Sequence, residues 1–238
     1  MISFFEEKYS IDISDKLAKQ EVMMFTSVGS SEGIMGYVDP SNDNILNLNK
    51  ELFTKYPERF ESTYVHETLH QIGVVSEPYN QLLDEGITDA LTDMIFCYMD
   101  KEPVLTPYYY ETRTLAYQLL AADPEIVSCY LENDVFDITE RINEKLKDVP
   151  QVLEKTDNLG RRLDDMETVL YNLTSGLVYD VGVDPNWVAM EAQEIVKAYC
   201  QACNPDKDTI DYIRSHYLLW GYEDIIIGLD IMGGYWME

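Results

Sequence analysis

Residues 57–99 read PERFESTYVHETLHQIGVVSEPYNQLLDEGITDALTDMIFCYM, and this stretch decides the expected fold. Apolar residues recur near the 3.6-residue period in both halves, so we predict one helix over 57–73 and a second over about 80–99. Gly73 suits a helix end, and Pro78 breaks the chain between the helices. The bend at Pro78 allows the second helix to fold against the first.

Strand patterns precede this stretch and helical patterns follow it. Residues 22–26, 33–39 and 44–49 are predicted as strands, the last two joined by a turn-rich segment at 39–44, and residues 13–19 as a helix. Further helices are predicted at 108–121, 124–133, 138–149, 164–180, 186–200 and 208–221. The expected fold class is α+β and mainly helical, with a small mixed sheet on the N-terminal side and a helical C-terminal subdomain.

The chain is expected to form one domain. Its 238 residues can bury a substantial core, and no repeats or low-complexity linkers divide them. We place the sheet and the first helix in residues 1–75, and the second helix with the helical subdomain in residues 76–238.

The composition is that of a strongly acidic globular protein. The formal net charge of −27 argues against binding to nucleic acid or to an anionic membrane surface, because both need clustered Lys and Arg. No apolar run approaches the roughly 20 residues that span a bilayer. We therefore expect neither nucleic-acid partners nor membrane insertion.

The opening residues and the cysteines bear on the cellular compartment. The start, MISFFEEKYSIDIS, lacks the basic end and long apolar stretch of a signal peptide, so we expect a cytoplasmic protein, or an extracellular or cell-surface one if a leader has been removed. Cys200 and Cys203 form a single Cys-x-x-Cys, whereas Cys97 and Cys129 stand alone. We interpret the four as ordinary thiols, with one local disulfide as the alternative.

His66, Glu67 and His70 form the most informative motif, His-Glu-x-x-His. Residues four apart lie one turn above one another on a helix, so both imidazoles can reach a single ion. Glu67 lies beside them, close enough to contact water on that ion. Two solvated or hydrogen-bonded helix histidines are the alternative interpretation.

A catalytic zinc ion needs a third protein ligand and one open position. In the next helix, Glu85 and Asp89 are one turn apart on one face, opposite the apolar side. A carboxylate at the position of Asp89 can hydrogen-bond to the outer nitrogen of a ligating histidine. We therefore favour Glu85 as the ligand over Asp84, Asp89 and Asp93, and predict a Zn²⁺ cofactor.

With these residues in this order, residues 64–93 resemble the gluzincins, zinc metallopeptidases of the zincin-like fold that include thermolysin. The resemblance implies that His66, His70 and Glu85 bind the metal, that Glu67 is the general base, and that Asp89 supports His66. It also implies a zincin-like catalytic domain and hydrolysis of peptide bonds by Glu-assisted attack of zinc-bound water. The implied partner is a peptide or protein substrate.

The sequence departs from the gluzincin pattern at two points. Only fourteen residues separate His70 from Glu85, a shorter connection than in thermolysin, and Gly86 follows the expected ligand. Both departures suit a compact member of the group. The metzincins are a poorer match, because they need a third histidine soon after a glycine and QIGVVSEPYNQ contains none.

Gluzincins supply a Tyr or His that stabilises the developing oxyanion, from the region after the glutamate helix. The candidates here are Tyr108, Tyr109, Tyr110 and His216, and we select Tyr109 and His216. Core packing is the alternative role for the tyrosines and a hydrogen-bonded structural role for His216. For Arg113 we favour a salt bridge over substrate binding.

The strand at 33–39 lies where zincins place the edge strand that pairs with an extended peptide. Its alternative role is that of an ordinary paired strand. Two other functions compete with peptide hydrolysis: a metal-binding domain without turnover, which does not need Glu67, and a helical interaction module without metal, whose acidic surface meets basic partners.

Overall fold

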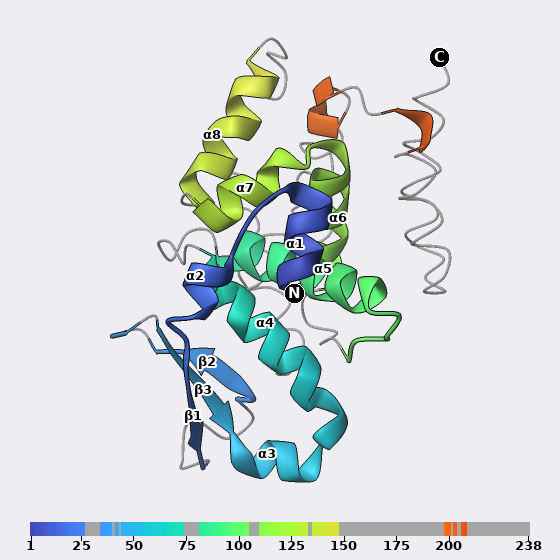
Figure 1. Cartoon of the computed structure of the whole chain (residues 1–238). Coiled ribbons are helices and arrows are strands. Elements are labelled where there is room, and N and C mark those ends of the chain that lie inside the picture. Colours follow the sequence, from blue (N-terminus) through green and yellow to red (C-terminus); the bar gives the residue numbers. More distant parts are fainter. Residues whose placement is uncertain are drawn as a thin grey trace, which may run out of the picture.

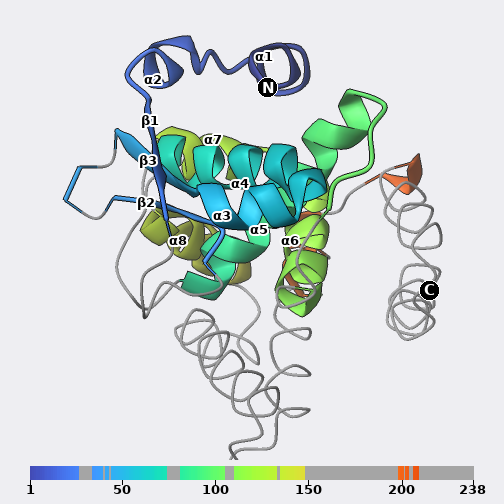
Figure 2. The same cartoon turned by 90° about the horizontal axis from the view of Figure 1, so that it is seen from below.

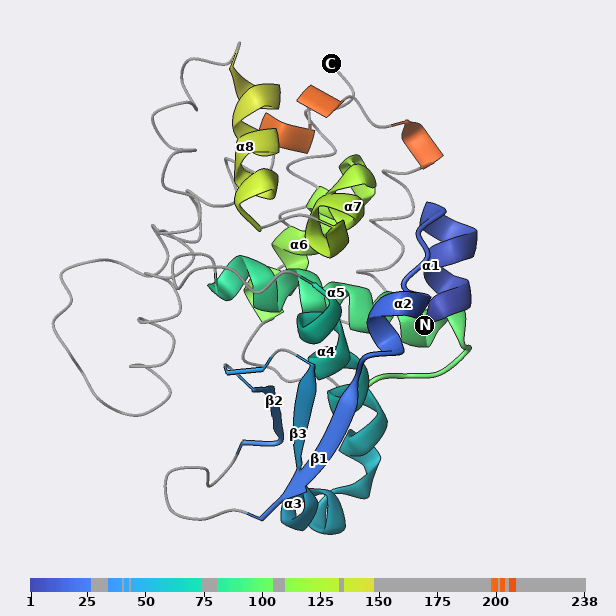
Figure 3. The same cartoon turned by 60° about the vertical axis from the view of Figure 1, so that its left-hand side comes forward.

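A small mixed sheet lies at one end of the protein and is followed by helices (Figures 1 and 3). The computed structural model describes residues 1–26, 34–39, 41–42, 44–73, 81–104, 110–132, 135–147, 198–200, 202–203 and 206–208. The strands are β1 (Glu21–Phe25), β2 (Gly36–Val38) and β3 (Ile45–Asn49), in the order β1-β3-β2. β1 runs parallel to β3 and β2 antiparallel to it, so β3 is the central strand.

Helix α4 (Phe60–Ile72) packs against β2 and β3 (Figure 3). Leu46 and Leu48 alternate along β3 on the face that meets the helix, and they form a small core with Phe53. The Asn49 side chain caps α3 (Lys50–Lys55) by accepting hydrogen bonds from the next helix turn. Pro57 then opens a 3₁₀ turn, η2 (Pro57–Arg59), that leads into α4, so the predicted helix at 57–73 begins with a tighter first turn.

Helix α5 (Gln81–Tyr98) is buried on almost every side between α4 and α6 (Tyr110–Ala122). Its apolar side, which includes Ile87, Leu91 and Ile95, contributes to the main core. The opposite side is polar and is buried as well, with the residues Asp84, Thr88, Asp89, Thr92 and Asp93. Buried polar side chains need hydrogen-bond or ionic partners, and two of those partners, His66 and His70, come from α4.

Helices α6, α7 (Glu125–Glu132) and α8 (Val135–Leu146) complete the main core on the side away from the sheet (Figure 1). Asp123, before α7, ties this region together because its carboxylate accepts hydrogen bonds from Arg141 at 2.6 and 2.9 Å and from Tyr199 at 2.5 Å. The Arg141 guanidinium and the Tyr199 hydroxyl outweigh partial burial and lower the pKa of Asp123. The bonds thereby join residues that are far apart in the sequence.

The N-terminal segment packs across the helices instead of extending the sheet (Figure 2). Helix α1 (Ile2–Tyr9) buries Phe4 and Phe5 completely, and α2 (Ser14–Leu17) carries Lys16. The Lys16 ammonium donates to the backbone carbonyls of Ile72 and Leu131, which lie at the C-terminal ends of α4 and α7. A cation at these two ends complements both helix dipoles.

The structure confirms the coarse fold prediction of a mainly helical α+β protein with a small mixed sheet. The three predicted strands and the helices that begin near residues 60, 81, 110, 125 and 135 are present within a few residues of their expected limits. Helices α1 and α3 were not predicted. The helix predicted at 164–180 lies outside the described residues, as do most of those at 186–200 and 208–221.

Two further observations concern membrane spans and the cysteines. In the part of the chain that the structure describes, no helix is both long enough and apolar enough to cross a membrane. All four cysteines are free thiols, and Cys200 is buried with its sulfur 3.5 Å from the carbonyl oxygen of Gln118.

Gly86 allows α5 and α6 to approach each other closely. A Cβ atom at this position would lie 2.7 Å from the carbonyl oxygen of Thr112 and 2.8 Å from its carbonyl carbon. Both atoms belong to the α6 backbone and cannot rotate away. The glycine beside the expected ligand Glu85 therefore has a packing role.

We expect the substitution Gly86→Ala to destabilise the protein by about 1–3 kcal/mol, because the added methyl group overpacks the interface between α5 and α6. On helix propensity alone, alanine would instead stabilise by roughly 1 kcal/mol. Chemical denaturation of both proteins measures the difference. A variant that is as stable as the wild type, or more stable, would contradict this close packing.

Candidate metal centre

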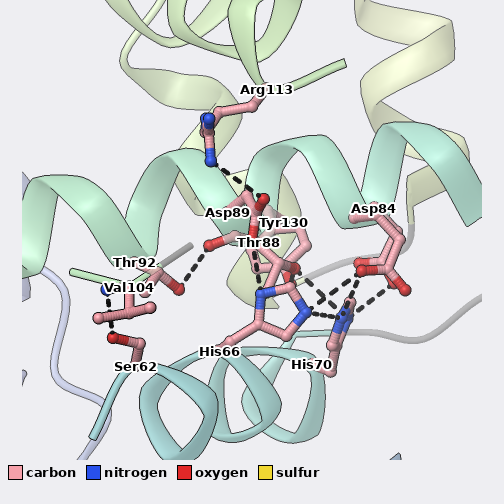
Figure 4. A network of polar contacts seen from close by, with 11 residues as sticks. Ser62, His66, His70, Asp84, Thr88, Asp89, Thr92, Val104, Arg113 and Tyr130 are labelled. Carbon is pink, nitrogen blue, oxygen red and sulfur yellow. Dashed lines mark hydrogen bonds and ion pairs between the residues drawn. The ribbon is translucent and has the colours of Figure 1, made fainter. Parts of the chain in front are cut away.

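Three side chains from α4 and α5 converge on one point, and Figure 4 shows the two histidines among them. His66 and His70 lie one turn apart on α4, and their Nε2 atoms are 3.1 Å from each other. Glu85 on α5 places its Oε2 atom 3.2 Å from Nε2 of His66 and 3.3 Å from Nε2 of His70. The three atoms form a nearly equilateral triangle, and these residues make up the group that could hold a metal ion among the described residues.

Each imidazole is oriented by a carboxylate on its far side. Asp89 Oδ1 lies 2.9 Å from Nδ1 of His66, and Asp84 Oδ2 lies 2.9 Å from Nδ1 of His70. Because each carboxylate accepts the Nδ1 proton, both Nε2 atoms are left with a free lone pair. Arg113 on α6 lies 3.4 Å from the other oxygen of Asp89, which agrees with its predicted salt bridge.

The convergent atoms require a positively charged partner. With both Nδ1 atoms protonated, two nitrogen lone pairs and a carboxylate oxygen face one another at close range. Glu85 Oε2 is buried and has no hydrogen bond of normal geometry, although the two nitrogens lie near it. Only protons or a cation can stabilise such a group of acceptors away from water.

The dimensions of the triangle suit zinc. Ligands that surround zinc tetrahedrally at about 2.0–2.1 Å lie about 3.3–3.4 Å from one another. The observed separations of 3.1, 3.2 and 3.3 Å are close to this value. Two imidazoles and one carboxylate are also a donor set typical of catalytic zinc.

In the absence of metal, protons compete for the same atoms. Burial lowers the pKa of His66, but the hydrogen-bonded Asp89 and the adjacent Glu85 carboxylate outweigh it and raise that pKa to about 9. Burial likewise opposes the charge on His70, yet Asp84 and Glu85 raise its pKa well above the usual value. The same histidines outweigh the effect of burial on Glu85 and lower its pKa. The centre is therefore built to hold positive charge.

Glu67 lies beside the centre and is not a member of the convergent triangle. Its Cγ atom would be 2.9 Å from a Cβ added to Gly36, so the side chain occupies the space between α4 and strand β2. Burial raises the pKa of its carboxyl group, although His70 and His66 act in the opposite direction. Glu67 thus interacts electrostatically with both imidazoles, but it is not one of the possible metal ligands.

The structure brings together most of the residues predicted from the sequence. His66, His70, Glu85 and Asp89 lie in the expected relation, with Glu67 next to them. Tyr108, Tyr109 and His216 lie outside the described residues, as does the side chain of Tyr110. Asp93, one of the rejected ligand candidates, instead pairs with the Tyr117 hydroxyl.

The orienting role of Asp84 was not predicted, since it was considered only as an alternative metal ligand. Neighbouring residues on a helix point about 100° apart, so nothing in the local sequence indicates that Asp84 and Glu85 flank the same ring. Thr88 and Tyr130, which lie behind His70, were also missed. The crossing of α4, α5 and α7 brings these residues together.

Comparisons with known proteins add no relative: no protein-family model, curated protein or solved structure matches the chain. The resemblance to the gluzincins therefore stays a prediction from the motif residues.

We expect the protein to bind one zinc ion per chain, and the variants His66→Ala, His70→Ala and Glu85→Gln to lose most of that affinity. Because zinc binds the folded state, free zinc at 100 times the Kd should stabilise the wild type by about 2.7 kcal/mol. Elemental analysis and thermal unfolding after dialysis against zinc measure both effects.

Glu144→Gln is the matched control for these variants, because Glu144 is an exposed residue of α8 and not part of the convergent triangle. It should bind zinc like the wild type. Less than about a tenth of an equivalent of zinc on the wild type, or full binding by the Glu85→Gln variant, would contradict the assignment.

Proposed function

We propose that this protein is a zinc-dependent metallopeptidase of the gluzincin type with a zincin-like catalytic domain. The observation that supports this most strongly is the convergence of His66, His70 and Glu85, with Glu67 beside them and free of a ligand role. A purely structural metal site would use its fourth position for another protein ligand and would not need an adjacent unpaired acid.

Each residue of the site has a distinct role in this proposal. His66, His70 and Glu85 hold the zinc ion, while Asp89 and Asp84 fix the orientation and tautomer of the two imidazoles. When bound, zinc supplies Lewis acidity, which polarises a carbonyl oxygen and lowers the pKa of water at the site. The charge of the carboxylates keeps the cation in place.

Glu67 is the proposed general base. It takes a proton from the attacking water and returns it to the nitrogen of the departing amine as the peptide bond breaks. Burial raises the pKa of Glu67 towards neutral pH. The carboxylate is then a better proton acceptor, and the carboxylic acid can still donate the proton. The Glu67 side chain lies against β2, and we propose that the proton transfer occurs beside that strand.

Strand β2 offers a binding edge for the substrate. It pairs with β3 on one side, and in the described part of the sheet it is an outer strand. A peptide in extended conformation can add to such an edge through backbone hydrogen bonds, with little regard to its side chains. The net charge of −27 makes neutral or basic peptides better substrates than acidic ones through long-range repulsion.

Stabilisation of the oxyanion is assigned to Tyr109 and His216, as predicted from the sequence. Each donor of this kind contributes about 100- to 1,000-fold to kcat in enzymes that use it. The variants Tyr109→Phe and His216→Asn should therefore show which of the two residues stabilises the oxyanion. Substitution of that residue should lower kcat by about this factor and leave zinc binding unchanged.

The substitution Glu67→Gln should abolish peptide cleavage and leave zinc in place. The amide cannot accept a proton at neutral pH, so a loss of about 100- to 10,000-fold in kcat is expected. A mixture of quenched fluorescent peptides reports cleavage, and elemental analysis reports zinc. Glu61→Gln is the matched control, because Glu61 is an exposed residue of the same helix paired with Lys101.

The outcome distinguishes the peptidase from a metal-binding domain without turnover. Cleavage by the wild type and the Glu61→Gln variant, and none by the Glu67→Gln variant, agrees with the peptidase. Zinc binding without any cleavage by the wild type indicates a metal-binding domain without turnover. Unchanged cleavage by the Glu67→Gln variant removes Glu67 from the mechanism.

A further inference from the structure

A second set of hydrogen bonds lies behind His70, on the side away from the convergent triangle (Figure 4). The Thr88 hydroxyl on α5 is 2.6 Å from the Tyr130 hydroxyl on α7 and 3.3 Å from Nδ1 of His70. All three residues are buried, and Tyr130 is completely so. A residue of α7, distant in sequence from the motif, thus reaches the metal centre.

The position of Tyr130 is tightly constrained. A Cβ atom added to Gly73, which ends α4, would lie 2.7 Å from Cζ of the Tyr130 ring. The ring therefore packs directly against the backbone at the end of the histidine-bearing helix. Such contact holds the hydroxyl group at a fixed place relative to His70.

The direction of these hydrogen bonds affects the state of His70. If Thr88 donated its proton to Nδ1, the ring proton would move to Nε2 and the lone pair needed by a cation would be lost. Asp84 accepts the Nδ1 proton at the shorter distance of 2.9 Å, which favours the tautomer with the proton on Nδ1 and the lone pair on Nε2. The Thr88 proton must then point elsewhere, and the oxygen of Tyr130 is its nearest partner.

The Tyr130 hydroxyl keeps its own proton. Burial and the nearby negative charge of Asp84 raise the pKa of the phenol well above the usual value. A protonated hydroxyl group still carries two lone pairs, so it can accept the proton of Thr88.

We propose that Tyr130 is a positioning residue of the metal centre: its hydroxyl accepts the Thr88 proton, so that Thr88 does not donate to Nδ1 of His70 and the ring proton stays on that nitrogen. His70 then donates this proton to Asp84. This proposal depends on the metal site of the proposed function and not on peptide hydrolysis.

The test compares Tyr130→Phe with Tyr199→Phe. Tyr199 is a matched control, because it is also completely buried and donates to a carboxylate, Asp123, that belongs to another part of the protein. Zinc affinity is measured by competition with a chromophoric chelator. We expect zinc affinity to fall about tenfold in Tyr130→Phe, the smaller loss that is typical when a side chain supporting a metal ligand is removed. In Tyr199→Phe, zinc affinity should stay within about twofold of the wild type.

A second measurement does not depend on the variants. The chain has three histidines, so ¹⁵N-labelled histidine gives a simple NMR spectrum of the zinc-loaded protein. In the wild type, His66 and His70 should both carry the proton on Nδ1. In Tyr130→Phe the Nδ1 proton of His70 should exchange faster, whereas that of His66, held by Asp89, should not change.

Each outcome decides the proposal. Equal zinc affinity of Tyr130→Phe and wild type, an equal loss in both phenylalanine variants, or a proton on Nε2 of His70 in the wild type would overturn it while leaving the zinc site intact. A wild type that binds no zinc would overturn both this proposal and the proposed function. Zinc binding without peptide cleavage affects only the proposed function.

Discussion

Two nitrogen lone pairs and one carboxylate oxygen meet between α4 and α5, and the organisation of the protein follows from the need to keep them together. The pairwise separations of 3.1, 3.2 and 3.3 Å would be strongly repulsive without a shared positive partner. The sheet and the small core around Leu48 fix α4 from one side. The main core fixes α5 from the other side. Packing of the two cores therefore holds these acceptors close together.

Helix α5 serves the core and the site at once. Its apolar side is embedded in the main core, and its polar side presents buried Asp and Thr residues to α4 and α7. Close backbone approaches at Gly86 and Gly73 allow this arrangement, because any larger residue there would push α5 from α6 or Tyr130 from α4. The rigidity of such packing suits a site in which ligands must hold their positions to within a fraction of an ångström.

The sequence is informative where local periodicity carries the signal. The spacing of His66 and His70, and of Glu85 and Asp89, predicts their faces on two helices, and the bend between the helices predicts their approach. It is uninformative where tertiary packing decides. Helix α1 is an example, because it is held by burial of Phe4 and Phe5, and Asp84 and Tyr130 are others, because their partners lie on other helices.

Anomalous diffraction from a crystal of the zinc-loaded protein, recorded on both sides of the zinc absorption edge, locates the metal ion and its ligands. We expect a single strong peak between α4 and α5, about 2.0–2.2 Å from Nε2 of His66, Nε2 of His70 and a carboxylate oxygen of Glu85. No peak at this place, or a Glu85 side chain directed into solvent, would contradict this expectation.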